Sequence, residues 1–212
     1  MYLPQNTGGD FELAPAGTHL AVCYRVIDLG TQAVDWQGQT KHQRKVLLSW
    51  ELPDEQMSDG RPFSIGQRYT LSSSEKARLR QDLESWRGRP FTDVDFDPAN
   101  PNRFNIKKLI GVGCLLTVVH TEKAGKSYAN IKSIAKLMKG QAAPPPVNPT
   151  VYFSLDEYDE ATFQGLSEGL RKIIAGSPEF IELSRAHLHD EQPQREHAPA
   201  FDDSIPFAPC VD

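Results

Sequence analysis

The sequence contains little cysteine, and its cysteines do not suggest pairing. There are three, Cys23, Cys114 and Cys210, and none stands in a C-x-x-C motif or at zinc-site spacing from another Cys or His. The pattern therefore supports neither a disulfide framework nor a zinc site. Cys23 and Cys114 lie within apolar runs, so we expect both to be small core residues, and a reducing cytoplasm fits best.

Long hydrophobic stretches are also missing. No apolar run approaches the ~20 residues that span a bilayer, and residues 1–10 lack the basic and apolar regions of a secretory signal. We therefore expect a cytoplasmic protein with no membrane partner. With 212 residues and 39% apolar content, the chain can form one domain with appendages or two small domains.

The common catalytic motifs are not found. The sequence has no Walker P-loop, G-x-G-x-x-G, G-x-S-x-G or H-E-x-x-H. Asp93, Asp95 and Asp97 suggest a metal loop, but the segment lacks the central Gly and terminal Glu of a calcium loop, and Pro98 follows directly. A solvated loop is the better interpretation, so we expect no catalytic residues, no metal and no cofactor.

What the chain does have is a charge asymmetry. Residues 1–140 contain 19 Lys and Arg against 15 Asp and Glu, whereas residues 141–212 contain 4 against 13. The net charge of −5 is therefore divided into a body of +4 and a tail of −9. Local basic patches on such a body could bind a polyanion that the tail would repel.

Alternating apolar residues predict a body built of strands. Five β-prone runs are bounded by Gly, Pro or polar turns, and they cover residues 18–29, 43–52, 63–71, 112–121 and 127–137. We expect residues 30–41 to form a polar connection that carries Trp36. Residues 122–126, which include Gly125, read as a basic hairpin tip.

One helix is predicted between the third and fourth runs. Ser72 and Glu75 have the spacing of a capping box, and Gly88 followed by Pro90 should end the helix. A loop over residues 92–104 and a short turn over 106–110 should follow. The apolar stripe of this helix consists of Leu79, Leu83 and Trp86.

This order of elements favours a mainly β, five-stranded OB-like Greek-key barrel with a helical insert between strands three and four. A five-stranded SH3-like barrel is the main alternative, although it usually lacks such an insert. We assign residues 1–140 to this nucleic-acid-binding domain and residues 141–150, with four prolines, to a stiff linker. Residues 151–188 read as a small helical appendage that needs a surface to pack on. Residues 189–212 read as a disordered acidic tail.

Basic and aromatic residues alternate over the predicted barrel. Single-stranded nucleic acid is held by cations along its phosphates and by aromatic rings under its bases. OB-folds present such groups on their second and third strands and on the loops that join strands one to two and four to five. The candidate DNA-binding residues are Trp36, Lys41, Arg44, Lys45, Arg68, Tyr69, Lys123, Lys126, Tyr128 and Lys132.

Several of these residues also have a purely structural interpretation. Trp50, Phe63 and Tyr69 share strand faces with aliphatic residues, which favours the core, and Trp86 lies on the helix stripe. Trp36 stands in a polar segment, so ligand contact and structure remain equal alternatives. A cluster of helix arginines could pair with Asp82 and Glu84 or follow a second stretch of phosphates; it consists of Arg78, Arg80, Arg87 and Arg89.

The end of the chain carries a short acidic and apolar peptide that includes Asp202, Asp203, Ile205, Pro206 and Phe207. It resembles the acidic tip of bacterial single-stranded-DNA-binding proteins, which recruits partner proteins. Ser204 replaces a usual Asp, and Ala208 to Asp212 follow the phenylalanine that is terminal in those proteins. The resemblance implies a partner hook, and an acidic shield over a basic groove is the alternative.

Four runs in the body resemble bacteriophage single-stranded-DNA-binding proteins. These are Val26 to Gly30, Lys41 to Lys45, Trp86 to Phe91 and Lys126 to Ile131. The resemblance implies an OB-fold that coats single strands with little sequence preference during phage DNA replication or recombination, in the host cell cytoplasm.

Three functions remain open from the sequence. The first is a non-enzymatic, sequence-tolerant single-stranded-DNA-binding protein whose partners are single-stranded DNA and, through its tip, replication or recombination proteins. The second is an adaptor whose barrel binds a protein rather than DNA. The third, a nuclease or ligase fragment, is disfavoured because no clustered acidic metal site is visible. Self-association into a homo-oligomer is left open.

Overall fold

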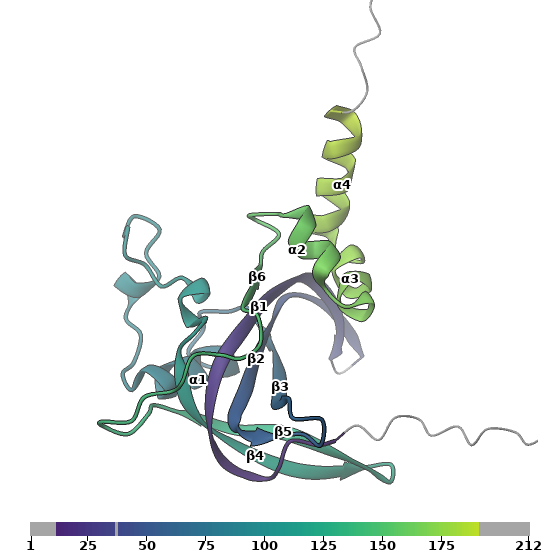
Figure 1. Cartoon of the computed structure of the whole chain (residues 1–212). Helices are drawn as coiled ribbons and strands as arrows, with labels where there is room; N and C mark the ends of the chain where they lie inside the picture. The colour runs from purple at the N-terminus through teal and green to yellow at the C-terminus, as the bar shows by residue number, and fades with distance from the viewer. Residues whose placement is uncertain (1–11, 37, 191–212) are drawn as a thin grey trace, which may run out of the picture.

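The computed structural model describes residues 12–36 and 38–190, and within them the protein is mainly β (Figure 1). The strands are β1 (Gly17–Trp36), β2 (Gln39–Gln56), β3 (Pro62–Thr70), β4 (Gly113–Lys123), β5 (Lys126–Ala135) and β6 (Val151–Phe153). The helices are α1 (Arg78–Arg87), α2 (Glu160–Gly165), α3 (Glu168–Ala175) and α4 (Pro178–Asp190), with 3-10 turns η1 (Asp93–Asp95) and η2 (Ile106–Leu109).

The strands form one open sheet in which β1 holds the central position. The order is β3-β2-β1-β4-β5, with antiparallel neighbours, and β6 pairs with β1 in parallel. β1 pairs with β4 over residues 17–22 and with β6 over residues 25–27, so β6 takes the place beside β1 that β4 leaves. The C-terminal segment is therefore joined to the sheet by backbone hydrogen bonds as well as by packing.

β1 contributes side chains to two separate cores because successive residues of a strand point to opposite faces. Val26 packs on the inner face with Trp50 and Trp86. Ile27 and Leu29 point to the outer face, where they pack with the C-terminal helices. One strand thus supports the body of the protein and its appendage at the same time.

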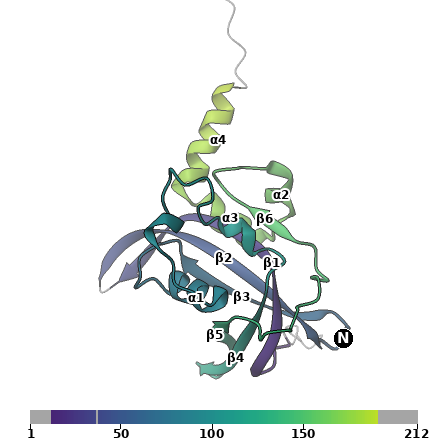
Figure 2. The same cartoon turned by 90° about the vertical axis from the view of Figure 1, so that its left-hand side faces the viewer.

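α1 covers the inner face of the sheet, as Figure 2 shows. Its predicted stripe of Leu79, Leu83 and Trp86 is buried, and the Trp86 Nε1–H donates to the Gly113 carbonyl at 2.9 Å. Gly88 ends the helix with a φ of 70°, the left-handed geometry that glycine adopts readily.

The predicted capping box is wrong, because the helix starts later than expected. α1 begins at Arg78, and its N-cap, Ala77, makes no side-chain capping bond. The Ser72 hydroxyl instead accepts the Ser74 backbone N–H at 3.2 Å, a local hydrogen bond in the segment between β3 and α1. Ser and Thr often make such local bonds outside helices, and the sequence spacing alone does not separate the two uses.

The C-terminal appendage packs on the outer face of β1, which provides the surface that so small a segment was expected to need. Its helices bury Phe153, Phe163 and Leu170 against Ile27 and Leu29. In both views α4 extends away from the sheet (Figure 1, Figure 2). The predicted appendage begins with a strand, β6, that the sequence analysis did not distinguish from helix.

Gly30 permits the close contact between β1 and the appendage. Its φ is 67°, and a Cβ at this position would lie 2.4 Å from the Ser177 side chain and 2.9 Å from that of Leu155. A larger residue would collide with Ser177, just before α4, and with Leu155, just after β6, and would also be strained at this positive φ.

The first connection also differs from its prediction. Residues 30–41 were expected to form a loop, but β1 continues to Trp36 and β2 starts at Gln39, which makes one long hairpin. Polar residues can extend a strand pair where neither face is buried, because ladder hydrogen bonds do not depend on side-chain polarity. Among the described residues, no helix has the length and apolarity that crossing a membrane requires.

Candidate nucleic-acid interface

The outer face of β2 and β3 carries two of the predicted cations. Lys45 and Arg68 lie on this face because their neighbours Val46 and Tyr69 point into the core. The Lys45 Nζ donates to Gln43 Oε1 at 2.7 Å and to Thr70 Oγ1 at 2.8 Å. Partial burial lowers the pKa of Lys45. The lysine is thus held in place by neutral partners, which leave its charge uncompensated.

Gln43 and Thr70 were not predicted as part of this site. Thr70 pairs in register with Lys45 across the two strands, and Gln43 lies two residues before Lys45 on the same face. A period-2 alignment of the two runs could have found them, but only once the register between the strands was known.

The β4–β5 hairpin carries a second basic group at its tip. Lys123 and Lys126 pair in register and are exposed. Between them, Ala124 and Gly125 have φ values of 51° and 73°, the positive values that a type I′ hairpin turn requires. The tight turn fixes the two ammonium groups on one short arm, as the sequence predicted for a basic hairpin tip.

An exposed aromatic ring lies beside these lysines. The Tyr128 side chain is 46% exposed, and the residue pairs with Thr121 across the hairpin. Next to it, Asn130 Nδ2 donates to Thr121 Oγ1 at 2.7 Å. A largely exposed ring flanked by amide and ammonium groups is a suitable surface for a stacked base.

Lys132 lies further along β5, where the strand meets α1. Its side chain is exposed, while its backbone carbonyl accepts Arg78 Nη2 at 2.8 Å. Lys41 is likewise exposed, near the end of the first hairpin. Within residues 12–36 and 38–190, none of Lys41, Arg68, Lys123, Lys126 and Lys132 makes an ion pair.

Tyr69 does not belong to this surface, which corrects its inclusion among the candidate contacts. The residue is only 3% exposed, and its hydroxyl donates to Asp82 Oδ2 at 3.0 Å. Burial, with the nearby Asp82 charge, raises the pKa of Tyr69. Its ring packs under α1 and cannot stack on a base, in agreement with the alternative interpretation as a core residue.

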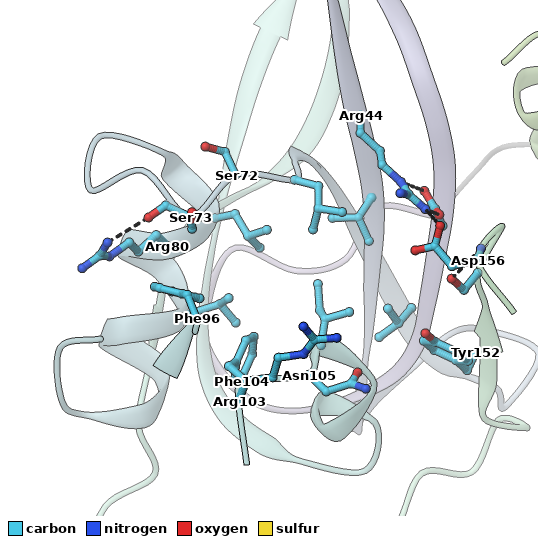
Figure 3. A pocket seen from close by; sticks show the side chains of 18 of the residues that line it. Arg44, Ser72, Ser73, Arg80, Phe96, Arg103, Phe104, Asn105, Tyr152 and Asp156 are labelled. Atoms are coloured by element: carbon cyan, nitrogen blue, oxygen red, sulfur yellow. Dashed lines mark hydrogen bonds and ion pairs between the residues drawn. The ribbon is translucent and has the colours of Figure 1, made fainter. Parts of the chain in front are cut away.

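Arg44 is also a structural residue rather than a free phosphate ligand. Its guanidinium donates to Asp28 at 2.5 Å and to Asp156 at 2.8 Å (Figure 3). The hydrogen bond to Asp28 is the main cause that raises the pKa of Arg44. Asp28 also accepts the backbone N–H groups of Gly30 and Leu155. The group therefore ties the first hairpin to the appendage.

The arginines on α1 form ion pairs with nearby carboxylates, which was the structural alternative to a second phosphate-binding track. Arg78 Nε lies 2.7 Å from Asp82, and Arg80 Nε lies 2.9 Å from Glu84. Arg87 contacts Asp95 at 3.3 Å. Three of the four predicted cations of this cluster are thus matched by carboxylates, and Arg89 alone is exposed without such a pair in the described part of the chain.

Two groups of predicted site residues fall wholly or partly outside the description. Trp36 is the last residue of β1 and pairs with Gln39, but its side chain is not among those described. The tip residues Asp202, Asp203, Ile205, Pro206 and Phe207 lie outside the described residues. Their predicted roles as a base contact and a partner hook stay predictions.

The two described cysteines lie in the core of the protein. Cys23 and Cys114 are buried core residues, as predicted, and burial raises the pKa of Cys23 to about 12. Among residues 12–36 and 38–190, no three His, Cys, Asp or Glu side chains gather as a metal site would require.

Comparison with known proteins adds no assignment. No protein-family model matches the sequence, and no curated protein matches it. Any function must therefore be inferred from the surface residues: cations on β2, β3 and the β4–β5 hairpin that have no ion-pair partner in the described part of the chain, and one exposed tyrosine, Tyr128, on that hairpin.

Proposed function

We propose that the protein is a non-enzymatic, sequence-tolerant single-stranded-DNA-binding protein that protects or organises single strands in phage replication or recombination, in the host cytoplasm. The observation that carries the proposal is a set of residues, hereafter the basic face, that have no ion-pair partner in the described part of the chain: Lys41, Lys45, Arg68, Lys123, Lys126, Tyr128 and Lys132. The acidic tip at Asp202 to Phe207 would recruit partner proteins or compete for this face.

The topology supports an OB-like Greek-key barrel as the finer description of the fold. β1 pairs with both β2 and β4, and α1 stands between β3 and β4 in the chain. The sheet curls until β3 approaches β5. These pairings support an OB-like barrel as part of the proposal, and an OB-fold has its ligand face on the second and third strands and on the loops that flank them.

The chemistry of the basic face suits single strands better than a specific duplex site. Unpaired ammonium groups bind phosphates and release counterions, which gives affinity without sequence preference. An exposed tyrosine ring adds stacking with any base, worth ~1–3 kcal/mol per base. Within the described part of the chain, α1 packs against the sheet, and the projecting helix α4 carries three acidic residues against one arginine, a composition that does not favour entry into a DNA groove.

Titration with oligonucleotides tests the proposal directly. Of the three tryptophans, Trp50 and Trp86 are buried, so quenching of tryptophan fluorescence by oligo(dT) should report on Trp36. We expect binding at ~50 mM salt that weakens steeply as salt rises, stronger for single strands than for a duplex. The quenching should disappear in Trp36→Phe while binding, followed by anisotropy of a labelled strand, persists.

No detectable binding to single strands at ~50 mM salt would overturn the proposal. In that case the adaptor function would gain support if a protein complex forms without nucleic acid. The control is the chain truncated after Ala200, which removes the acidic tip: stronger binding after truncation would indicate competition, and unchanged binding would indicate a partner hook.

A further inference from the structure

A concave surface lies on the inner face of the sheet, whereas Lys45 and Arg68 of the basic face lie on the outer face. A cavity of about 500 Å³ opens between α1, the segment before η2 and β6 (Figure 3). This volume is within the range of small-ligand pockets. Leu71 to Ser73, which follow β3 directly, form one edge. β3 carries Arg68 on the outer face and leads directly into this edge, so a strand bound at Arg68 would reach the cavity by passing around the end of β3.

The floor of the cavity is apolar and belongs to the main core. It is formed by Val26, Val46, Leu79, Leu83 and Phe91. A fully polar ligand would lose hydration at such a floor without replacing it. The occupant should therefore have a flat or compact apolar part of a few rings.

Aromatic rings form the walls. Phe96 and Phe104 are half-buried, and their centroids lie 4.8 Å and 5.0 Å from that of Phe91, which fixes their positions. Tyr152 lines another side of the cavity, where the Lys107 ammonium lies 4.6 Å from its ring centroid. Rings held in this way offer preformed stacking surfaces at little entropic cost.

The charges around the cavity are balanced by one another, with one exception. Arg44 is bonded to Asp28 and Asp156, and Arg80 donates to Glu84 and to two backbone carbonyls. Arg103, by contrast, is exposed and has no side-chain partner in the described part of the chain. In Figure 3 its guanidinium points into the cavity. Among the described residues that line the cavity, Arg103 is thus the one cation without a carboxylate partner, and it stands over an apolar floor.

Polar groups for a ligand edge are also present. Asn105 accepts the Lys107 backbone N–H at 2.9 Å through its Oδ1, which leaves its NH₂ group for another acceptor. Ser73 lies on the opposite edge of the cavity. A neutral ring system with carbonyl and amino groups would satisfy these side chains, whereas a free anion would find only Arg103.

We propose that this cavity takes one unstacked nucleotide of the bound strand. The base lies on the apolar floor between Phe104 and Tyr152, its polar edge meets Asn105, and its phosphate meets Arg103. The inference rests on the proposed function, since the nucleotide arrives as part of a single strand. A base taken out of a stack costs a few kcal/mol, which aromatic contacts on both sides can offset.

The test follows backbone amide resonances of the full chain during titration with dTMP up to about 10 mM, then with oligo(dT). Inorganic phosphate is the control for simple anion binding. We expect dTMP, but not phosphate, to shift Ser73, Phe104 and Asn105. Arg103→Ala and Phe104→Leu should each weaken dTMP binding at least fivefold, whereas Arg185→Ala, which removes an exposed arginine from α4, should leave it unchanged.

The outcomes separate the pocket from the basic face. Binding of oligo(dT) with no shift of Ser73, Phe104 or Asn105 by either ligand would overturn the pocket and leave the proposed function standing. Shifts with dTMP but no oligo(dT) binding would support a nucleotide site and overturn the single-strand function. If inorganic phosphate shifts the Ser73, Phe104 and Asn105 resonances as much as dTMP does, the nucleotide assignment is overturned. It is also overturned if truncation after Ala200 causes the same shifts in the absence of nucleotide.

Discussion

Arg44 and Lys123 were both predicted to contact DNA, yet the structure gives them different surroundings. Arg44 lies between two carboxylates and joins the first hairpin to the appendage. Lys123 stands at a hairpin tip with Lys126 opposite and no acidic partner in the described part of the chain. The difference shows that a cation on a predicted binding strand becomes a ligand group only where the fold leaves it without a carboxylate. Matched substitutions at the two places should therefore have opposite effects on stability and binding.

The largest effect is expected from breaking the Arg44 group. Arg44→Ala leaves Asp28, a buried carboxylate, without its charge partner, and loss of one member of a buried pair costs about 3 kcal/mol. The midpoint of urea denaturation should fall accordingly. Arg68→Ala is the control, because an exposed side chain without an ion pair should change stability by less than about 0.5 kcal/mol. Equal stability of the two variants would contradict the comparison.

The opposite effect is expected at the hairpin tip. The double variant Lys123→Ala and Lys126→Ala should keep its denaturation midpoint but lose roughly tenfold in affinity for oligo(dT). Its plot of log affinity against log salt should become shallower by about 1.4, because each phosphate contact to a single strand contributes ~0.7. Anisotropy titrations at several salt concentrations measure both quantities. An unchanged slope would show that these lysines do not meet phosphates.

Tyr128 and Tyr69 make a second comparison between an exposed candidate contact and a core residue, with smaller expected effects. Tyr128→Leu should weaken oligo(dT) binding about fivefold through lost stacking and leave stability unchanged. Tyr69→Phe should leave binding unchanged and lower stability by about 1 kcal/mol, because Asp82 loses one hydrogen-bond donor. Urea denaturation and oligo(dT) titration of both variants measure these effects. Weaker oligo(dT) binding by Tyr69→Phe would show that Tyr69 does contribute to the interface.

The smallest effect is a dependence of stability on pH at the contact between α4 and β1. Glu179 accepts the Thr31 backbone N–H at 2.9 Å and its hydroxyl at 2.5 Å. Burial opposes ionisation, but these hydrogen bonds outweigh it and lower the pKa of Glu179. Its stabilisation is therefore present above the unfolded pKa near 4.5 and is lost as pH falls through the lower folded pKa.

Replacing this carboxyl should make the dependence visible. Glu179→Gln should flatten the fall of the denaturation midpoint between about pH 5 and pH 3. Glu182→Gln, on the same helix and exposed, is the matched control and should leave the profile unchanged. Identical profiles for wild type and Glu179→Gln would contradict the anchoring role.

Much of the fold followed from local patterns in the sequence. The alternation in 43–52 and 63–71 located β2 and β3, and the stripe of Leu79, Leu83 and Trp86 located the buried face of α1. These features depend on neighbours within one element, so a single sequence contains them. The extension of the first hairpin and the start of α1 were missed because they depend on strand pairing and on local serine hydrogen bonds.

The candidate site was less predictable, because it depends on contacts between distant residues. Arg44 looked like Lys45 in the sequence, and only the fold brings it to Asp28 on the neighbouring strand and to Asp156, more than a hundred residues later. Tyr69 was separated from Tyr128 by burial under α1, which the strand pattern suggested but did not decide. The cavity around Arg103 had no signal in the sequence, since it is lined by segments far apart in the chain.

Mapping the bound strand onto the protein tests the central claim most directly. Amide resonances of the full chain should be followed while oligo(dT) is added at ~50 mM salt, where phosphate contacts are strong. We predict that shifts concentrate on the outer face of β2 and β3 and on the β4–β5 hairpin, including Lys45, Arg68, Lys126 and Tyr128. Shifts confined to the paired arginines of α1, or no shifts at all, would contradict the account.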